Sequence, residues 1–411
     1  MRTTLPNYIK VAMVLLSVTS SLCNITCAAQ KNNNQNLDKG LKLIYSKSNL
    51  PGFAVGIIQD DSTLFCQGYG FADIQQKKAY TPETIQPIGS VSKTFIGLAL
   101  VKALELGYFD LATNINKILP FQIINPHRPQ DTIRVIDLAT HTSGLVDNDS
   151  IYAITYCMGD SSNTQLAEFL KDYYTAKGAK YDSKNFISGK PGEYYSYSNI
   201  ASALTAYIIE VKSGMSFDDF TEKYLFLPLK MNHTTWQYKA EYNPAYATLY
   251  EINKQSLPLY KAIINKDNSL KRYSCITYPD GSLKSSVNDL IKYLKEINAG
   301  FKRVGIVTTA PFYEQLFTKR FKEENMPLNM PIAEPNRALF WAYNRKSKLS
   351  HNGSDPGVTT FISYDPSTRI GKILLMNTQI EGEDNIKTVE CCKRLIMEIE
   401  KYEFSIQQRL K

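Results

Sequence analysis

The chain has 411 residues, 43% of them hydrophobic, which is enough for a large core and two subdomains, so we expect a globular protein. Its formal net charge of +8 is a mild excess with no block of Lys and Arg and no interleaved aromatic residues, which excludes nucleic acid as an expected partner. Its four histidines are far apart and no CxxC or HExxH motif occurs, so we expect no metal and no other cofactor.

The first 29 residues have the three parts of an export signal. Arg2 and Lys10 precede the apolar run 11–22, and a stretch of small residues that ends at Ala29 follows it. We predict a signal peptide over 1–29, and cleavage after Ala29 would leave a net charge of +6. The apolar run contains four hydroxyl residues and is shorter than the ~20 residues of a membrane span, and no later stretch reaches that length. We therefore expect a periplasmic or secreted protein without a stable transmembrane anchor, with a lipoprotein as the alternative that the cysteines of this segment leave open.

The cysteines beyond the predicted cleavage site do not resemble a disulfide framework, because their number is odd and they are sparse. At least one of them must stay free or pair between chains. These residues are Cys66, Cys157, Cys275, Cys391 and Cys392.

In the first hundred residues, hydrophobic patterns predict a helix, a hairpin and a buried helix. Apolar residues recur at helical spacing around 37–44. Two strand-like runs, 53–59 and 63–69, are joined by a short polar turn, which predicts a hairpin. A nearly continuous apolar helix is expected over 91–106, ended by Gly107.

The middle of the chain, 113–280, is expected to be mainly helical. Helical patterns occur at 164–174 and 200–212, between loop signals rich in proline and asparagine.

Near the end, the strand-like runs 358–364 and 371–376 predict a second hairpin, and apolar residues at helical spacing predict a closing helix around 389–399. Strands therefore lie at both ends of the chain and helices in the middle. We expect an α/β (α+β) fold, in which an antiparallel sheet is flanked by terminal helices and carries an inserted mainly helical subdomain. The predicted sheet subdomain comprises 30–112 and 281–411, the helical subdomain comprises 113–280, and together they form one domain.

The segment Ser90-Val-Ser-Lys93 lies where the buried helix begins. A serine hydroxyl is a poor nucleophile without a nearby base, and a lysine three residues later lies on the same helix face. The backbone N–H groups at a helix N-terminus also favour developing negative charge. The alternative is a serine that only caps a core helix.

A second candidate is Tyr197-Ser-Asn199, in a loop before the predicted helix at 200. Two residues apart in an extended segment, Tyr197 and Asn199 point to the same side. The phenol can pass a proton to a leaving group, and the amide can hold a substrate carbonyl. The alternative is a tyrosine-rich packing loop in which Asn199 is a helix N-cap.

A third candidate is His351-Asn-Gly353-Ser354, ahead of the strand at 358. Gly353 would let a substrate lie close to the backbone, and the N–H of Ser354 would be a second donor to an oxyanion, with Ser90 supplying the first. The alternative is a plain loop.

In this order, the three motifs resemble those of the serine beta-lactamase and penicillin-binding-protein superfamily. Tyr-Ser-Asn in place of the Ser-Asp-Asn of class A enzymes is similar to the branch of class C beta-lactamases and D-Ala-D-Ala carboxypeptidases, which includes esterases and D-aminopeptidases. The similarity runs from Leu50 to Asn377 and implies a beta-lactamase/transpeptidase-like fold. In the similar segment 138–145, His141 is interpreted as part of a structural loop.

The resemblance implies a serine hydrolase that works through an acyl-enzyme. Ser90 would attack the substrate carbonyl, and Lys93 and Tyr197 would handle the protons. Asn199 would orient the substrate, the N–H groups of Ser90 and Ser354 would form the oxyanion hole, and water would release the acyl group.

One departure bears on the substrate. Class C beta-lactamases have Lys-Thr-Gly where this chain has His351-Asn-Gly353, and an unperturbed histidine is largely neutral at pH 7. His351 would attract a substrate carboxylate less than a lysine does, which favours a D,D-peptidase-like enzyme on peptidoglycan peptides, or an amide or ester hydrolase on small molecules, with beta-lactams as acylating ligands. The alternatives are a class C-like beta-lactamase and a catalytically inactive protein that binds cell-wall fragments.

Overall fold

The fold is described from a computed structural model that covers residues 30–251, 262–380 and 386–408. The predicted signal peptide over 1–29 lies outside the described residues. The chain divides into two compact units, one formed by residues up to Asn49 and from Lys387 onward, the other by Leu50–Ile386.

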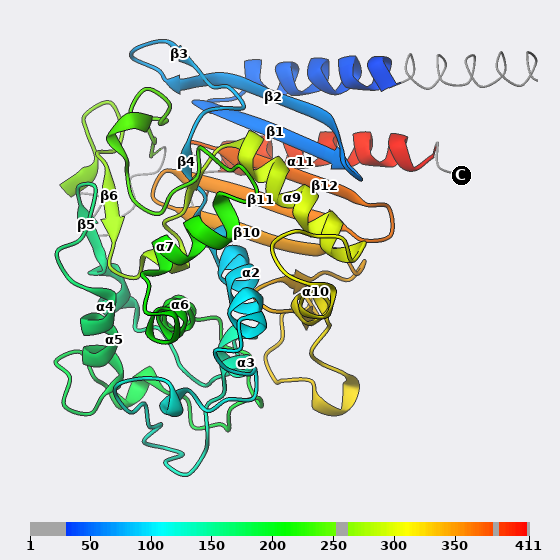
Figure 1. The fold of residues 1–411 in the computed structure, drawn as a ribbon. Coiled ribbons are helices and arrows are strands. Elements are labelled where there is room, and N and C mark those ends of the chain that lie inside the picture. The colour runs from blue at the N-terminus through cyan, green and yellow to red at the C-terminus, as the bar shows by residue number, and fades with distance from the viewer. Residues whose placement is uncertain (1–29, 252–261, 381–385, 409–411) are drawn as a thin grey trace, which may run out of the picture. The chain divides into compact units, whose positions relative to one another are not determined.

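An eight-stranded antiparallel sheet organises the larger unit (Figure 1). Both predicted hairpins are confirmed, and the first strand pairs with the last, Phe53 opposite Met376, which joins the two ends of this unit. The pattern of buried β-branched residues explains the central strands, since strand β1 is buried over nearly its whole length. In sheet order the strands are β3 (Lys78–Ala79), β2 (Ser62–Asp73), β1 (Gly52–Gln59), β12 (Ile370–Met376), β11 (Val358–Asp365), β10 (Leu349–Asp355), β9 (Ala342–Tyr343) and β8 (Asn336–Arg337).

Strand β10 contains the third motif, so the alternative of a plain loop there is wrong. The segment alternates between buried and more exposed residues along its length, as expected of a strand. A two-residue turn, Pro356-Gly357, then leads into β11.

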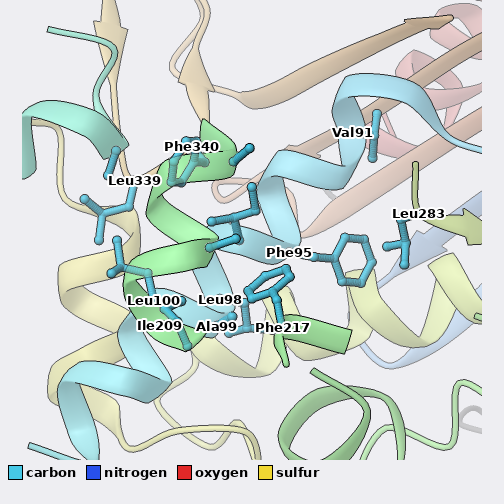
Figure 2. Packing of buried hydrophobic residues seen from close by; sticks show 14 of the residues in the cluster. Val91, Phe95, Leu98, Ala99, Leu100, Ile209, Phe217, Leu283, Leu339 and Phe340 are labelled. Carbon is cyan, nitrogen blue, oxygen red and sulfur yellow. The ribbon is translucent and has the colours of Figure 1, made fainter. Parts of the chain in front are cut away.

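The buried helix is confirmed as α2 (Ser92–Glu105), whose residues are almost all buried. Figure 2 shows Phe95, Leu98 and Leu100 of this helix among core side chains that include Ile209. The Phe95 ring also stacks on Tyr293 with centroids 4.0 Å apart. Helix α2 packs against α6 (Asn199–Ser213) and α10 (Ala310–Phe317), while α9 (Val287–Phe301) packs against β1 and β12.

The middle of the chain has the helices that its pattern predicts, namely α5 (Leu166–Tyr174) and α6. One core cluster contains residues from both predicted subdomains, for example Ala54, Leu138 and Ile209. The predicted boundaries at 112–113 and 280–281 stay a prediction. The other short elements of the larger unit are β4 (Gln86–Pro87), η1 (Gly89–Val91), η2 (Ile115–Lys117), α3 (Val135–Ala139), α4 (Asp149–Ala153), β5 (Tyr156–Met158), η3 (Ser183–Asn185), α7 (Phe217–Thr221), η4 (Glu222–Phe226), η5 (Ala240–Tyr242), β6 (Tyr273–Cys275), η6 (Tyr278–Asp280), β7 (Lys284–Ser285) and η7 (Glu323–Asn325).

The smaller unit pairs a helix over 30–46 with α11 (Ile386–Gln407), so both expected terminal helices are present. Gln30 Nε2 donates to the Tyr402 hydroxyl over 2.6 Å, and Asn33 Nδ2 donates to Ser405 Oγ over 2.7 Å. Within the described ranges, no helix is long and apolar enough to cross a membrane.

Candidate active site

A cavity of about 550 Å³ lies beside Ser90 and gathers the residues of the three sequence motifs. Six of the seven predicted site residues line it. The seventh, Lys93, is fully buried and does not line the cavity, but its side-chain nitrogen contacts Ser90 Oγ. The six lining residues are Ser90, Tyr197, Asn199, His351, Gly353 and Ser354.

Lys93 joins the first two motifs through hydrogen bonds. Its ammonium donates to Ser90 Oγ over 3.0 Å, to Asn199 Oδ1 over 2.7 Å and to the Asp280 backbone carbonyl over 2.6 Å. These three bonds use all three ammonium hydrogens and hold the amine against the serine. Ser90 is not a helix cap, because η1 and α2 are preceded by Ile88 and Val91 and neither has a side-chain cap. The capping alternative for Ser90 is therefore wrong.

Asn199 is the first residue of α6 and points its amide oxygen at Lys93. The N-cap is Ser198, whose Oγ accepts from the Ala201 N–H over 3.0 Å, so the alternative of Asn199 as N-cap is wrong. The sequence analysis missed Asp147, which accepts from the Ser198 hydroxyl over 2.6 Å and the Asn199 N–H over 2.7 Å. Asp147 thus fixes the helix terminus that presents Asn199, although burial raises the pKa of its carboxyl.

Tyr197 lies over the Lys93 ammonium, which is 5.1 Å from the ring centroid. The His141 ring stacks on the Tyr197 ring, with centroids 4.4 Å apart. The Ser198 N–H donates to His141 Nδ1 over 3.3 Å, and burial beside Arg337 and Lys93 lowers the pKa of His141 well below its usual value. His141 is therefore neutral, and besides lying in a loop it contacts the predicted proton-transfer residue directly.

The backbone of η1 approaches that of β10 closely enough that two glycines are required. Gly89 has φ +54°, and a Cβ on it would lie 2.9 Å from the Ser354 nitrogen. A Cβ on Gly353 would lie 2.1 Å from the Ile88 carbonyl oxygen and 3.2 Å from the Ser90 nitrogen. The space that Gly353 leaves is thus occupied by the protein's own backbone rather than by a substrate. This contact brings the segments that carry the Ser90 and Ser354 N–H groups together.

His351 is 8% exposed and is held by its own strand. Its Nδ1 is 2.8 Å from the Asn352 carbonyl oxygen, so Nδ1 carries the proton and Nε2 is left as an acceptor. Burial and the Lys93 charge lower the pKa of His351 to about 3. At neutral pH this position therefore presents an uncharged acceptor.

The cavity also contains a cation that the sequence analysis missed. Arg337, from the two-residue strand β8, donates through Nη2 to the Tyr195 hydroxyl over 2.7 Å and pairs with Glu334 over 2.8 Å. Its Nε is buried and has no hydrogen-bond partner within the described residues. A lone arginine in a loop-rich segment has no sequence pattern that would have identified it.

Asp280, Asp355 and two tyrosines, Tyr152 and Tyr156, line the cavity as well and were also missed. Burial raises the pKa of Asp280 to about 6 and that of Asp355 to about 7. The described part of the chain contains no group of three or more His, Cys, Asp and Glu side chains that could hold a metal.

Comparisons with known proteins agree with this architecture. The family model described as Beta-lactamase matches residues 33–389. Protein Flp of Staphylococcus aureus (strain MW2) is 24% identical over 352 residues, and the match covers 84% of this chain but only 64% of that protein's length. A class C beta-lactamase superposes with a TM-score of 0.65 at 20% identity, covering 90% of this chain and 96% of its own. The octameric penicillin-binding protein homologue from Pyrococcus abyssi superposes with a TM-score of 0.63 at 24% identity, covering 83% and 73%. The two solved structures therefore share the fold.

Proposed function

Because the chain belongs to the beta-lactamase family and is thereby a serine hydrolase of that superfamily, we propose that it is an exported, D,D-peptidase-like enzyme that forms an acyl-enzyme on Ser90. The observation that carries the proposal is the Lys93 ammonium, which contacts both Ser90 Oγ and Asn199 Oδ1 beneath the ring of Tyr197. Export rests on the sequence of residues 1–29 alone.

In the proposed reaction, the Lys93 ammonium first gives up one proton to solvent. As Ser90 Oγ attacks the substrate carbonyl, its proton passes to the neutral Lys93 amine, and Tyr197 relays this proton onward. The carbonyl oxygen becomes an oxyanion between the N–H groups of Ser90 and Ser354. As the tetrahedral intermediate collapses, Tyr197 protonates the leaving amine and the acyl group stays on Ser90. A water molecule then attacks the ester, and the same residues return the proton to Ser90.

The charges at the cavity favour a substrate with a terminal carboxylate in its leaving group. His351 is neutral, but Arg337 lines the same cavity and is close enough to lower the pKa of His351. The buried Nε of Arg337 has no acceptor among the described residues. A guanidinium is well suited to bind a carboxylate. We therefore propose Arg337 as the residue that receives the C-terminal carboxylate of a peptidoglycan peptide.

Two other functions remain as alternatives, a class C-like beta-lactamase and an inactive protein that binds cell-wall fragments. The neutral His351 counts against the first, since a lysine there would attract a carboxylate more strongly. The 3.0 Å contact between Lys93 and Ser90 counts against the second, because a binding protein needs no activated serine.

Labelling with a fluorescent penicillin and a fluorophosphonate tests the proposal. Both probes should modify Ser90, and Ser90→Ala should abolish the signal. Ser92→Ala is the matched control, because Ser92 is a buried serine two residues away whose Oγ accepts from the Leu283 N–H, and it should keep the signal. If neither probe labels the folded protein, the binding-protein alternative is correct.

Hydrolysis of D-Ala-D-Ala peptides, D-amino-acid amides, short esters and nitrocefin then identifies the substrate class. We expect the peptides or simple amides and esters to be turned over faster than nitrocefin. High turnover of nitrocefin would instead establish a beta-lactamase.

A further inference from the structure

The cavity has an acidic end that the acylation chemistry does not use. Asp280 and Asp355 line it, although their side chains are buried. The Tyr152 hydroxyl donates to Asp280 Oδ1 over 3.1 Å, and the Tyr156 hydroxyl donates to Asp355 Oδ1 over 2.6 Å. The second oxygen of Asp355 accepts from the Tyr273 hydroxyl over 3.1 Å. Asp280 Oδ2 is buried and has no hydrogen-bond partner among the described residues.

The nearby lysines do not bond to these carboxylates. Lys93 directs its three hydrogens to Ser90, Asn199 and the Asp280 backbone carbonyl. Lys284 donates to the backbone carbonyls of Trp236 and Ser282 over 2.8 and 3.0 Å. A buried carboxylate is costly unless it is paired and hydrogen-bonded, and burial accordingly raises the pKa of both aspartates. A cationic group of the substrate would supply the missing donor at Asp280 Oδ2.

The walls of this end also suit a cation. The rings of Tyr152 and Tyr156 meet edge to face with centroids 5.7 Å apart, and both residues line the cavity beside the carboxylates. Aromatic faces attract ammonium groups, most strongly where water is excluded. Carboxylates and phenol rings together therefore select a positive charge over a neutral or negative group.

Strand β10 shows which half of the substrate meets this end. Side chains alternate along a strand, so His351, Gly353 and Asp355 share one face, and the outer two are about 13 Å apart. Gly353 lies against the backbone of Ser90, so His351 and Asp355 lie on opposite sides of the nucleophile. The Tyr197 ring is 6.5 Å from the His351 ring. In the proposed reaction Tyr197 protonates the leaving group, which therefore lies on the His351 side and leaves the acyl group on the Asp355 side.

We propose that Asp280 and Asp355 bind a protonated amine carried by the acyl half of the substrate. Asp280 Oδ2 accepts a hydrogen from the ammonium, and the bound ammonium favours the ionised form of Asp355, which then adds a second negative charge. The assignment of this end to the acyl half rests on the proposed function, while the preference for an amine rests on the two carboxylates and the phenol rings.

Binding to the Ser90→Ala protein tests the inference without turnover. The probes are a D-alanyl-D-alanine peptide with one free amine on its acyl side and its N-acetylated counterpart, compared by calorimetry at fixed salt. A charge-assisted hydrogen bond predicts a Kd about 10- to 100-fold lower for the free amine. Adding Asp280→Asn, which keeps the shape but removes the charge, should bring the two affinities within about threefold of each other.

The matched control is Glu334→Gln, which removes a carboxylate from the same cavity but pairs with Arg337. It should leave the amine preference unchanged. Asp355→Asn is the second variant and should reduce the preference, and thermal unfolding checks that each variant is folded.

A second comparison uses the wild-type enzyme and short esters whose acyl groups carry either a free or an acetylated amine, measured as kcat/KM. The inference is overturned if the free-amine and acetylated peptides have the same Kd and the two esters the same kcat/KM. It is also overturned if the preference for the free amine survives Asp280→Asn. Failure of the proposed function is distinct, because it appears as absence of covalent labelling at Ser90.

Discussion

At the scale of single residues, burial controls the charges around the nucleophile, and it acts in opposite directions on His351 and Asp355. Burial lowers the pKa of the histidine to about 3 because it disfavours the imidazolium, and it raises that of the aspartate to about 7 because it disfavours the carboxylate. Both side chains belong to β10 and lie on either side of Ser90. Burial therefore reduces the charge on both sides of Ser90.

The raised pKa of Asp355 predicts a dependence of stability on pH. An aspartate carboxyl usually has a pKa of 3.8, so a native pKa of about 7 means that between these two pH values the folded protein holds a proton that the unfolded chain has lost. The resulting stabilisation is fully present below pH 4 and is lost as the pH rises to about 7, by roughly 2–4 kcal/mol. Asp280, Lys284 and the phenols of Tyr156 and Tyr273 share this environment.

Asp355→Asn removes this titration. Urea unfolding at pH 5 and pH 8 should show the variant gaining stability relative to wild type as the pH rises. A difference between the two proteins that does not change with pH would contradict the assigned pKa.

At the scale of elements, the site depends on how closely η1 approaches β10. Gly89 of η1 and Gly353 of β10 are 264 residues apart in sequence, and only their lack of a side chain lets the two backbones meet. Helix α6 adds the third part, since Asp147 and Ser198 fix its N-terminus so that Asn199 faces Lys93.

Gly353→Ala should separate these two backbones. The new methyl group would lie 2.1 Å from the Ile88 carbonyl oxygen, so either β10 or the segment before η1 must shift. We expect a loss of about 1–3 kcal/mol in the free energy of unfolding and slower labelling of Ser90 by a fluorophosphonate.

Gly281→Ala is the matched control, because Gly281 lines the same cavity but its nearest neighbour to an added Cβ is 3.8 Å away. This variant should keep wild-type stability. Equal stability of the two alanine variants would show that the approach of η1 to β10 is not as tight as described.

At the scale of the whole molecule, the larger unit is held by a sheet that joins distant parts of the chain and by one continuous core, without disulfides among the described residues. The five cysteines beyond Ala29 are all free in the structure. Burial raises the pKa of the Cys66 and Cys392 thiols to about 11 and 12, and it also raises that of Cys275. Such thiols react slowly because little thiolate forms.

A thiol titration checks this description. The form that begins at Gln30 should release five thiols on denaturation without reductant, and in native protein at pH 8 Cys66, Cys275 and Cys392 should react only slowly. Reductant should leave the thermal midpoint unchanged. Fewer than five thiols, or a midpoint that falls when reductant is added, would show a disulfide.

Local patterns in the sequence determined the elements and named the residues at the centre of the site. Apolar runs predicted both hairpins and helix α2, and apolar residues at helical spacing predicted α5 and α6, because burial of a whole element or of one face leaves a regular trace in the chain. Ser90, Lys93, Tyr197, Asn199, His351, Gly353 and Ser354 were identified because each motif is short and contiguous.

The surroundings of that centre depend on how the chain folds. Arg337, Asp280 and Asp355 are single charged residues without a local pattern, and they matter because folding buries them in one cavity. The same holds for Asp147, whose partners are about 50 residues away. The ionisation of His351 and Asp355 likewise follows from burial and neighbouring charges, which are properties of the assembled fold rather than of any segment of the sequence.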